Sequence, residues 1–408
     1  METQKATATQ PPTSPTAAGE RAVQPARRWY YLDWLRVLAI LSVFLYHDAK
    51  IFDYDSTGSM ISNTQRDWGM TLFARILELW GMPLFFVLAA VAIFFSLTSR
   101  DNQHFLAERF KRLFIPYLGG VFLLGPPFVY IERITHAQFT GSFWQFLPHY
   151  FDGLYGFGGN FVWTGLHLWF LFLLFLFSLI LLPLFRYLKQ ANRAAVVLHK
   201  LPWLQGELFL VVPIVCTAIL EALVNLQPDG VGSRFFGGWS PVTYLGFFLC
   251  GYLLALNPQA LGSFERNRMR TLLLGLCTTL LYIILVIGYG YSSYSIPFSF
   301  LRALNAWLWL ATILGFARKY LNVNHPLLAS ANQAVLPFYI LHIPIIVIVA
   351  VFMITWNIPI LAKFLLIALV SFVIIIGLYQ GVIVRVPFLR FLFGMKAKEK
   401  RTLQVSHS

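Results

Sequence analysis

Ten apolar runs, each close to the length that crosses a lipid bilayer, dominate this chain of 408 residues. A transmembrane helix needs about 20 mostly apolar residues. Hydrophobic residues make up 58% of the sequence and charged residues only 12%, about half the charged share of a soluble domain. We therefore predict an all-α integral membrane protein. Its expected spans are residues 34–52, 70–98, 113–131, 162–186, 208–226, 239–256, 271–290, 298–317, 332–354 and 361–384.

The basic residues predict how these runs are oriented. The net charge is +14, but the charges lie in short segments between the runs, which indicates membrane topology rather than nucleic-acid binding. Every second segment carries a group of basic residues, and the segments between them carry single ones or none. Because cytoplasmic segments are enriched in Lys and Arg, both termini are expected in the cytoplasm. The groups are Arg100/Arg109/Lys111/Arg112, Arg186/Lys189/Arg193/Lys200, Arg266/Arg268/Arg270, Arg318/Lys319 and the stretch from Arg385 to Arg401.

The expected organisation is one membrane domain between two tails. Residues 1–28 are rich in Thr, Pro, Ala and Gln, which predicts a disordered cytoplasmic tail rather than a signal peptide. Residues 29–385 form the membrane domain, and 386–408 a basic cytoplasmic tail. The long external loop, 132–161, mixes aromatic residues with hydrogen-bonding groups. It is either a sugar-binding cap or an interfacial hairpin that only packs.

The first span carries polar residues that hydrocarbon makes costly. Arg36 and His47 are three helical turns plus about 20° apart, so they share one face, roughly 16 Å apart along the axis. Asp33 lies near the same face. His47 is expected toward the outer leaflet, where an imidazole can take a proton from a hydroxyl. Hydrogen bonding of His47 to a neighbouring helix, and extension of Arg36 to the headgroups, remain the alternatives.

Two further histidines are expected at a similar depth. His342 lies near the middle of a span, with Tyr339 one turn away on the same face. Pro337 and Pro344 flank it and free backbone carbonyls that need other partners. His167 lies early in an inward-running span. Each histidine could instead serve helix–helix hydrogen bonding, and no HxxxH or cysteine pair predicts a metal site.

Two arginines and two carboxylates are the other polar residues with candidate roles. Arg109 and Arg112, at i and i+3, could grip a phosphate or diphosphate, although anchoring at the cytoplasmic surface also explains them. Glu78 is expected to pair with Arg75, three residues earlier. Glu221 has no partner within its own span, and an unpaired intramembrane carboxylate predicts a functional site.

Together these residues resemble the acyltransferase-3 family of integral membrane acyltransferases, and within it the glucan-biosynthesis protein C branch. The family's arginine–ten residues–histidine motif is matched by Arg36 and His47 in LDWLRVLAILSVFLYH. Its arginine pair before the third span is matched by Arg109 and Arg112 in RFKRLFIPY. The phrases MPLFFVLAAVAIF, HLWFLFLLFLF and YILHIPIIV resemble three more of its signatures, although Ala89-Ala90 replaces the family's Ser-Gly or Ala-Gly.

The resemblance implies transfer of an acetyl or succinyl group from cytoplasmic acyl-coenzyme A to an extracytoplasmic carbohydrate hydroxyl. Arg109 and Arg112 would bind the coenzyme A phosphates, and Arg36 would steer the donor. His47 would act as the general base or carry the acyl group covalently. The remaining assignments are His342 and His167, for stabilising the oxyanion or orienting the acceptor, and Glu221, Trp169 and Tyr339, for substrate binding.

A transporter or exporter of a small or lipid-linked solute is the alternative function. Ten spans with polar groups at one depth suit it, but the sequence has no inverted or parallel repeat of the kind many transporters show. The expected partners are membrane lipid and a carbohydrate acceptor, without nucleic acid. A donor inside and an acceptor outside favour a bacterial inner membrane.

Overall fold

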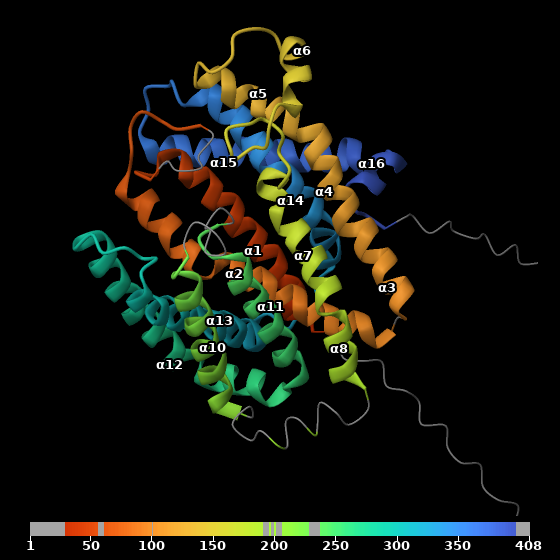
Figure 1. Ribbon diagram of the computed structural model, residues 1–408, viewed down its shortest axis with the longest axis vertical. Helices are drawn as coiled ribbons and strands as arrows, with labels where there is room; N and C mark the ends of the chain where they lie inside the picture. The colour runs from red at the N-terminus through yellow and green to blue at the C-terminus, as the bar shows by residue number, and fades with distance from the viewer. Residues whose placement is uncertain are drawn as a thin grey trace, which may run out of the picture.

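The structure, a computed structural model, consists of helices joined by short connections (Figure 1). It describes residues 29–55, 61–99, 101–190, 196, 200, 206–227 and 237–396. Within these residues the β-pairing is limited to one isolated bridge, between Leu154 and Phe161. The predicted all-α class is therefore confirmed. The predicted N-terminal tail lies outside the described residues, and so does the predicted C-terminal tail beyond residue 396.

The helices lie where the apolar runs predict them. The first half of the chain forms α1 (Tyr30–Ala49), η1 (Lys50–Phe52), α2 (Trp68–Ser99), α3 (Asn102–Arg109), η2 (Phe110–Phe114), α4 (Ile115–Gly119), η3 (Gly120–Leu124), α5 (Gly125–Thr135), α6 (Phe143–Phe146), η4 (Leu147–Phe151), η5 (Leu166–Leu168), α7 (Trp169–Ile180) and α8 (Leu182–Lys189). The second half forms η7 (Gly206–Leu210), α10 (Val211–Val224), α11 (Pro241–Leu256), α12 (Pro258–Ile283), η8 (Ile284–Gly288), α13 (Ile296–Tyr320), α14 (Pro326–Met353), α15 (Ile360–Leu378), η9 (Tyr379–Ile383) and α16 (Pro387–Leu392).

By length and composition, six helices in the described part of the chain can cross a membrane. A seventh is formed if α7 and α8, which meet at a bend of 53°, act as one span. α10 and α11 occupy two more of the predicted spans but are shorter than a full span. α1 is a continuous helix of 20 residues that also contains charged residues. The six are Trp68–Leu97, Asn102–Thr135, Pro258–Gly288, Ile296–Tyr320, Pro326–Met353 and Ile360–Ile383.

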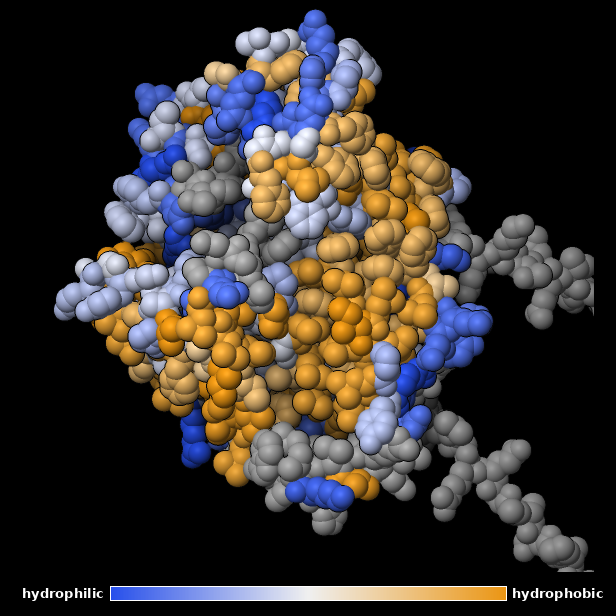
Figure 2. Space-filling model, viewed as in Figure 1, coloured by the Kyte–Doolittle hydropathy of each residue, from blue (hydrophilic) through white to orange (hydrophobic). Residues whose placement is uncertain are grey.

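The molecular surface agrees with a membrane location. Figure 2 shows apolar side chains gathered in a broad band across the visible face, with hydrophilic side chains above and below it. Long stretches of α12 and α15 contribute exposed leucine and isoleucine side chains, and only 22% of the most apolar window of each is buried inside the protein. Such a surface is stable when lipid covers it.

α1 and α2 lie at the centre of the helix arrangement (Figure 1). α1 packs against α2 and α14, while α2 also packs against α11. At that second contact a Cβ on Gly251 of α11 would lie 2.8 Å from the Cα of Val87 on α2. The close approach therefore uses a glycine of α11, whereas α2 presents the fully buried Ala90 at this point.

Residues 132–161 form a small folded cap, in which Phe146 and Tyr150 make an apolar cluster with the flanking Val129 and Val162. Arg133 holds the far end of the cap, because its Nη2 donates to the carbonyl of Gly159 at 2.9 Å. The cap is thus a built structure rather than a loose connection, as its aromatic content predicts.

Candidate functional site

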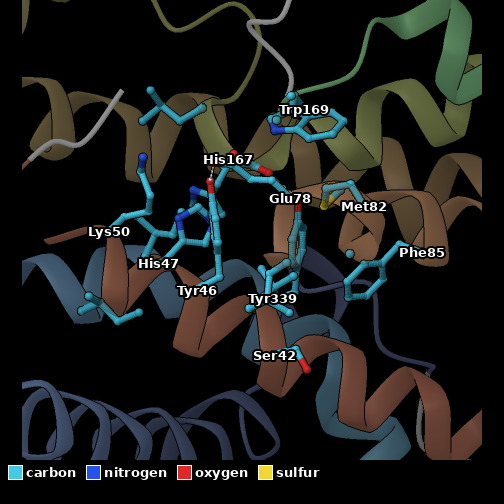
Figure 3. A pocket seen from close by; sticks show the side chains of 18 of the residues that line it. Ser42, Tyr46, His47, Lys50, Glu78, Met82, Phe85, His167, Trp169 and Tyr339 are labelled. Carbon is cyan, nitrogen blue, oxygen red and sulfur yellow. Dashed lines mark hydrogen bonds between the residues drawn. The ribbon is translucent and has the colours of Figure 1, made fainter. Parts of the chain in front are cut away.

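A cavity of about 650 Å³ lies between α1, α2, the start of α7 and α14 (Figure 3). This volume falls within the range of small-molecule binding sites. Its wall includes His47 of α1, Glu78 of α2, His167 of η5, Trp169 of α7 and Tyr339 of α14. The structure therefore brings together four predicted site residues, His47, His167, Trp169 and Tyr339, from three separate regions of the sequence.

Three histidines from three elements meet beside this cavity. The His342 ring lies between the other two, with its centroid 5.2 Å from that of His47 and 5.3 Å from that of His167. His47 and His167 line the cavity, whereas His342 is fully buried behind them. A substrate in the cavity can therefore touch His47 and His167, and His342 acts on it only through its neighbours.

Proline chemistry explains why His167 docks where it does. Pro344 has no N–H, so the carbonyl of Ile340, four residues earlier, loses its helical partner. Nε2 of His167 lies 3.1 Å from that carbonyl, and the Tyr339 hydroxyl donates to the carbonyl of His167 in return. The freed carbonyl predicted from the sequence is therefore satisfied by another predicted site residue.

These contacts also assign the protons on two of the rings. A carbonyl can only accept, so Nε2 of His167 and Nδ1 of His342, which lies 2.5 Å from the carbonyl of Tyr339, must each carry a hydrogen. The opposite nitrogens, Nδ1 of His167 and Nε2 of His342, are buried without a hydrogen-bond partner in the described part of the chain. In the neutral rings these nitrogens are bare acceptors. The His47 ring likewise has no hydrogen bond to the described residues, so it is available to a substrate hydroxyl.

A network of charged groups lines the cavity wall near the end of α1. Nζ of Lys50 lies 2.6 Å from Oδ2 of Asp53, and Arg75 pairs with both Asp55 and Glu78. The predicted pair of Arg75 and Glu78 is confirmed, at 3.0 Å. The hydroxyl of Tyr46 donates to the second Glu78 oxygen at 2.8 Å. Each charged group in this network therefore contacts at least one group of opposite charge, with three carboxylates around two cations.

The arginines predicted to handle the donor lie away from the cavity wall. Arg36 donates to the Asp33 carboxylate at 2.7 Å. It lies one turn before Ala39, which lines the cavity. Arg109 lies over the ring of Phe105, 5.0 Å from its centroid. The Arg112 guanidinium is half exposed and lies 3.4 Å from the carboxylate of Glu108 and from the carbonyl of Gly394. Because it is accessible, the Arg112 side chain can also contact an anion.

The third predicted substrate-binding residue, Glu221, does not line the cavity. It is fully buried, and its Oε1 lies 2.6 Å from Nη1 of Arg302 on α13. Thr243 of α11 donates to the other oxygen at 2.8 Å. The expectation of an unpaired carboxylate is therefore wrong, because its partner is 81 residues further along the chain.

Sequence reasoning also missed three residues of this region. Lys50 and Tyr46 flank the predicted His47, and Arg302 lies inside a predicted span. The signal for Arg302 is available in the sequence, since an arginine within an apolar run needs a buried partner. Lys50 has a local signal, because its partner Asp53 lies three residues further on, whereas Tyr46 has none, because its partner Glu78 lies on α2.

A model of the acyltransferase-3 family, described as an acyltransferase domain, matches residues 29–380. The chain belongs to this family. The match runs from the residue before α1 to the start of η9 and so includes the whole cavity wall. Together with the apolar helices, membership makes the protein a multi-pass membrane acyltransferase. No curated protein and no solved structure matches the chain. Within the described residues, no group of three or more His, Cys, Asp or Glu side chains is arranged to hold a metal ion.

Proposed function

We propose that the protein transfers an acetyl or succinyl group from cytoplasmic acyl-coenzyme A to a carbohydrate hydroxyl on the external side, with His47 as the general base. The observation that carries this proposal is the meeting of three histidines beside one cavity, with His47 on its wall. A hydroxyl needs a nearby base to become a good nucleophile, and imidazole is the side chain best matched to neutral pH.

The reaction requires one proton transfer and one acyl transfer. A ring nitrogen of His47 takes the proton of the acceptor hydroxyl as its oxygen attacks the thioester carbon. The carbon–sulfur bond then breaks, and the coenzyme A thiolate takes the proton from the imidazolium. The ring of His167, which lines the cavity, packs against the acceptor and helps to orient its hydroxyl toward the carbonyl carbon. His342 holds the two reactive rings apart at a fixed spacing.

The donor enters from the cytoplasmic side in this scheme. The scheme takes the chain to cross ten times with both termini inside, so that Arg109 and Arg112 lie at the inner mouth. The half-exposed Arg112 guanidinium supports a role in binding coenzyme A phosphates. The pantetheine arm then passes Arg36 and delivers the thioester along the α1 face that begins at Ala39. This arrangement suits a bacterial inner membrane.

The acceptor enters from the opposite side, beneath the cap of residues 132–161. Trp169 and Tyr339 offer aromatic surfaces in the cavity wall, and the Glu78 carboxylate offers hydrogen-bond acceptors. Aromatic faces beside carboxylates suit the alternating apolar and hydroxyl faces of a sugar. The resemblance to the glucan-biosynthesis branch makes an envelope glucan the first acceptor to test.

Acyl transfer by the purified protein tests this proposal. Labelled acetyl- and succinyl-coenzyme A are offered with a panel of envelope glycans, with His47→Ala beside a matched control, His104→Ala, whose exposed side chain lies on α3. We expect transfer to a glycan that falls by about 10²–10⁴-fold in His47→Ala and is unchanged in the control. Turnover near the wild-type value in His47→Ala would remove the residue from the mechanism.

Coenzyme A affinity separates the enzyme from a transporter. We expect the wild-type protein to bind coenzyme A, and the double variant Arg109→Ala/Arg112→Ala to bind it at least about tenfold more weakly, the loss of one charge-assisted contact. Lys111→Ala, which removes an exposed cation between them, is the control. Unchanged affinity in the double variant would leave the pair with an anchoring role. If the wild-type protein shows neither coenzyme A binding nor acyl transfer, the transporter is favoured.

A further inference from the structure

We propose that Arg302, a residue outside the cavity, is a positioning residue for acceptor binding. It acts by holding one wall of the cavity, formed by Gly237, Gly238 and Tyr294. The inference rests on the proposed acyl transfer and goes beyond it, because it assigns acceptor recognition to a wall built by α11, α13 and the residues just before them. The donor and the histidine cluster are not part of this wall.

Arg302 is almost completely buried, with 3% of its surface exposed, and four groups surround it. One guanidinium nitrogen pairs with Glu221 at 2.6 Å, and the other donates to the carbonyl of Gly238 at 2.6 Å. The rings of Trp239 and Tyr294 lie 4.2 Å and 4.8 Å from the guanidinium carbon. A planar guanidinium can stack on rings and donate in its own plane at the same time, which an ammonium cannot do.

The backbone that Arg302 holds has an unusual conformation. Gly237 and Gly238 both have positive φ angles, 77° and 85°, which residues with a Cβ rarely adopt. The carbonyl of Gly237 accepts from the Tyr244 hydroxyl at 2.8 Å, as the carbonyl of Gly238 accepts from Arg302. Two side chains from α11 and α13 therefore fix two successive peptide groups of the cavity wall.

This wall is continuous with the residues that suit an acceptor. The indole N–H of Trp239 donates to the backbone carbonyl of Glu78 at 3.1 Å. A Cβ on Gly237 would lie 3.2 Å from the ring of Trp169, so the glycine backbone packs directly beside that ring. Glu78 and Trp169 appear on one side of the cavity in Figure 3.

Tyr294 completes the wall from the other side. It lines the cavity and 36% of its surface is exposed, although its ring packs on the buried Arg302. A ring fixed from behind by a guanidinium offers a preorganised surface, on which a sugar loses less freedom when it binds. Without Arg302 the Tyr294 ring and the Gly238 peptide would lose the group that holds them, and only the contact of Tyr244 with Gly237 would remain.

A purely structural role is the competing explanation, because Glu221, Thr243 and Arg302 tie α10, α11 and α13 together. The two explanations differ in what a lysine can restore. Lysine keeps the ion pair with Glu221 but cannot also stack on two rings and donate to Gly238. A structural role therefore predicts that Arg302→Lys has the acceptor KM of the wild type. A positioning role predicts an acceptor KM between those of the wild type and Arg302→Met.

The test is steady-state kinetics of the full-length protein. Two substrate concentrations are varied separately: that of acyl-coenzyme A and that of the glycan found to accept the labelled acyl group. We expect the acceptor KM to rise about tenfold in Arg302→Met and Tyr294→Ala, the effect of losing about one stacking contact, and less in Arg302→Lys. The KM for acyl-coenzyme A and kcat stay close to wild type. Tyr291→Ala, at an exposed tyrosine outside the cavity wall, is the matched control.

Two variants keep the proposal testable if Arg302→Met does not fold. Tyr294→Ala and Gly238→Ala leave the buried ion pair intact, and a Cβ on Gly238 meets no atom within 4 Å, so it strains only the backbone. Both should raise the acceptor KM. The inference would be overturned by a wild-type acceptor KM in both variants, or by a wild-type acceptor KM in Arg302→Lys. The proposed function would still stand in that case, provided that His47→Ala blocks transfer. A wild-type protein without transfer would overturn both.

Discussion

The cavity has two polar regions that differ in whether their buried polar groups have partners. Around Lys50 and Arg75, each charged group contacts an opposite charge, and the Tyr46 hydroxyl adds a further hydrogen bond to Glu78. Around His342, two of the three rings keep a nitrogen without a hydrogen-bond partner in the described residues. An unsatisfied buried polar group costs about 1–3 kcal/mol. The comparison teaches that the charged groups are satisfied by one another, whereas the histidine cluster leaves two buried ring nitrogens unsatisfied, as expected if the cluster is kept for the proposed chemistry rather than for stability.

The largest effect is expected where the charged network is broken. In Lys50→Met, the carboxylate of the fully buried Asp53 loses its cation, and removing one partner of a buried pair costs about 3–5 kcal/mol. Thermal unfolding in detergent should show this loss, while turnover of the folded protein stays close to wild type. Lys50→Met/Asp53→Asn, which removes both charges, should recover most of the stability. A stable but inactive single variant would reverse the roles assigned to the two regions.

The second effect concerns the histidine cluster. His342→Phe keeps a ring between His47 and His167 but removes its hydrogen bond to the Tyr339 carbonyl, so this ring no longer fixes the spacing of the other two. We expect kcat to fall by about 10²-fold, the effect of a misplaced catalytic group, with little change in melting temperature. His325→Ala, at the start of the same helix, should leave kcat unchanged. A large fall in stability with normal kcat would show that the cluster only packs.

A smaller effect is expected at Glu78, which belongs to the charged network and also lines the cavity. Glu78→Gln keeps the side-chain volume and leaves Arg75 its pair with Asp55. Loss of about one hydrogen bond to the acceptor, about 1 kcal/mol, should raise the acceptor KM about fivefold. Glu265→Gln, which disturbs an ion pair with Arg318 outside the cavity, is the control. An unchanged KM would confine Glu78 to the stabilising network.

The smallest effect is expected in the cap. Burial and the nearby Glu132 carboxylate raise the pKa of Tyr155 above its ordinary value, so its hydroxyl stays a donor to Glu132 at 3.1 Å. Tyr155 also lines the cavity, but Tyr155→Phe keeps its ring, so it should lower stability by about 1 kcal/mol and leave acyl transfer unchanged from neutral to mildly alkaline pH. Tyr130→Phe, which loses a hydrogen bond within the same cap, is a comparison of similar size. A loss of transfer would make the cap part of the acceptor site.

The sequence predicted the depth of the site residues better than their partners. Span boundaries and charge pattern gave His47, His167 and His342 a common layer, and the structure brings their rings together. Spacing along one helix also gave the pair of Arg75 and Glu78. These predictions succeed because a helix fixes both rise and direction for every residue on it.

Contacts between helices could not be predicted in the same way. Glu221 and Arg302 lie 81 residues apart, and the rotation of each helix about its axis decides whether they meet. Polar residues in the spans reveal that partners must exist, but a single sequence does not reveal which ones. The same limit applies to the Ile340 carbonyl. The sequence predicts that prolines in this span free backbone carbonyls, but it does not predict that His167 is the donor to this one.

The polarity of α1 has a consequence for how the protein is made. α1 is the first helix of the described chain, yet it carries Asp33, Arg36, His47 and Asp48 toward its two ends, and polar and charged residues within a span make its insertion into lipid less favourable. Its neighbour α14, which covers the histidine face, begins only at Pro326. Burial of these polar groups therefore makes assembly cooperative: α1, which precedes the other described helices in the chain, is fully covered only after α14 has been made.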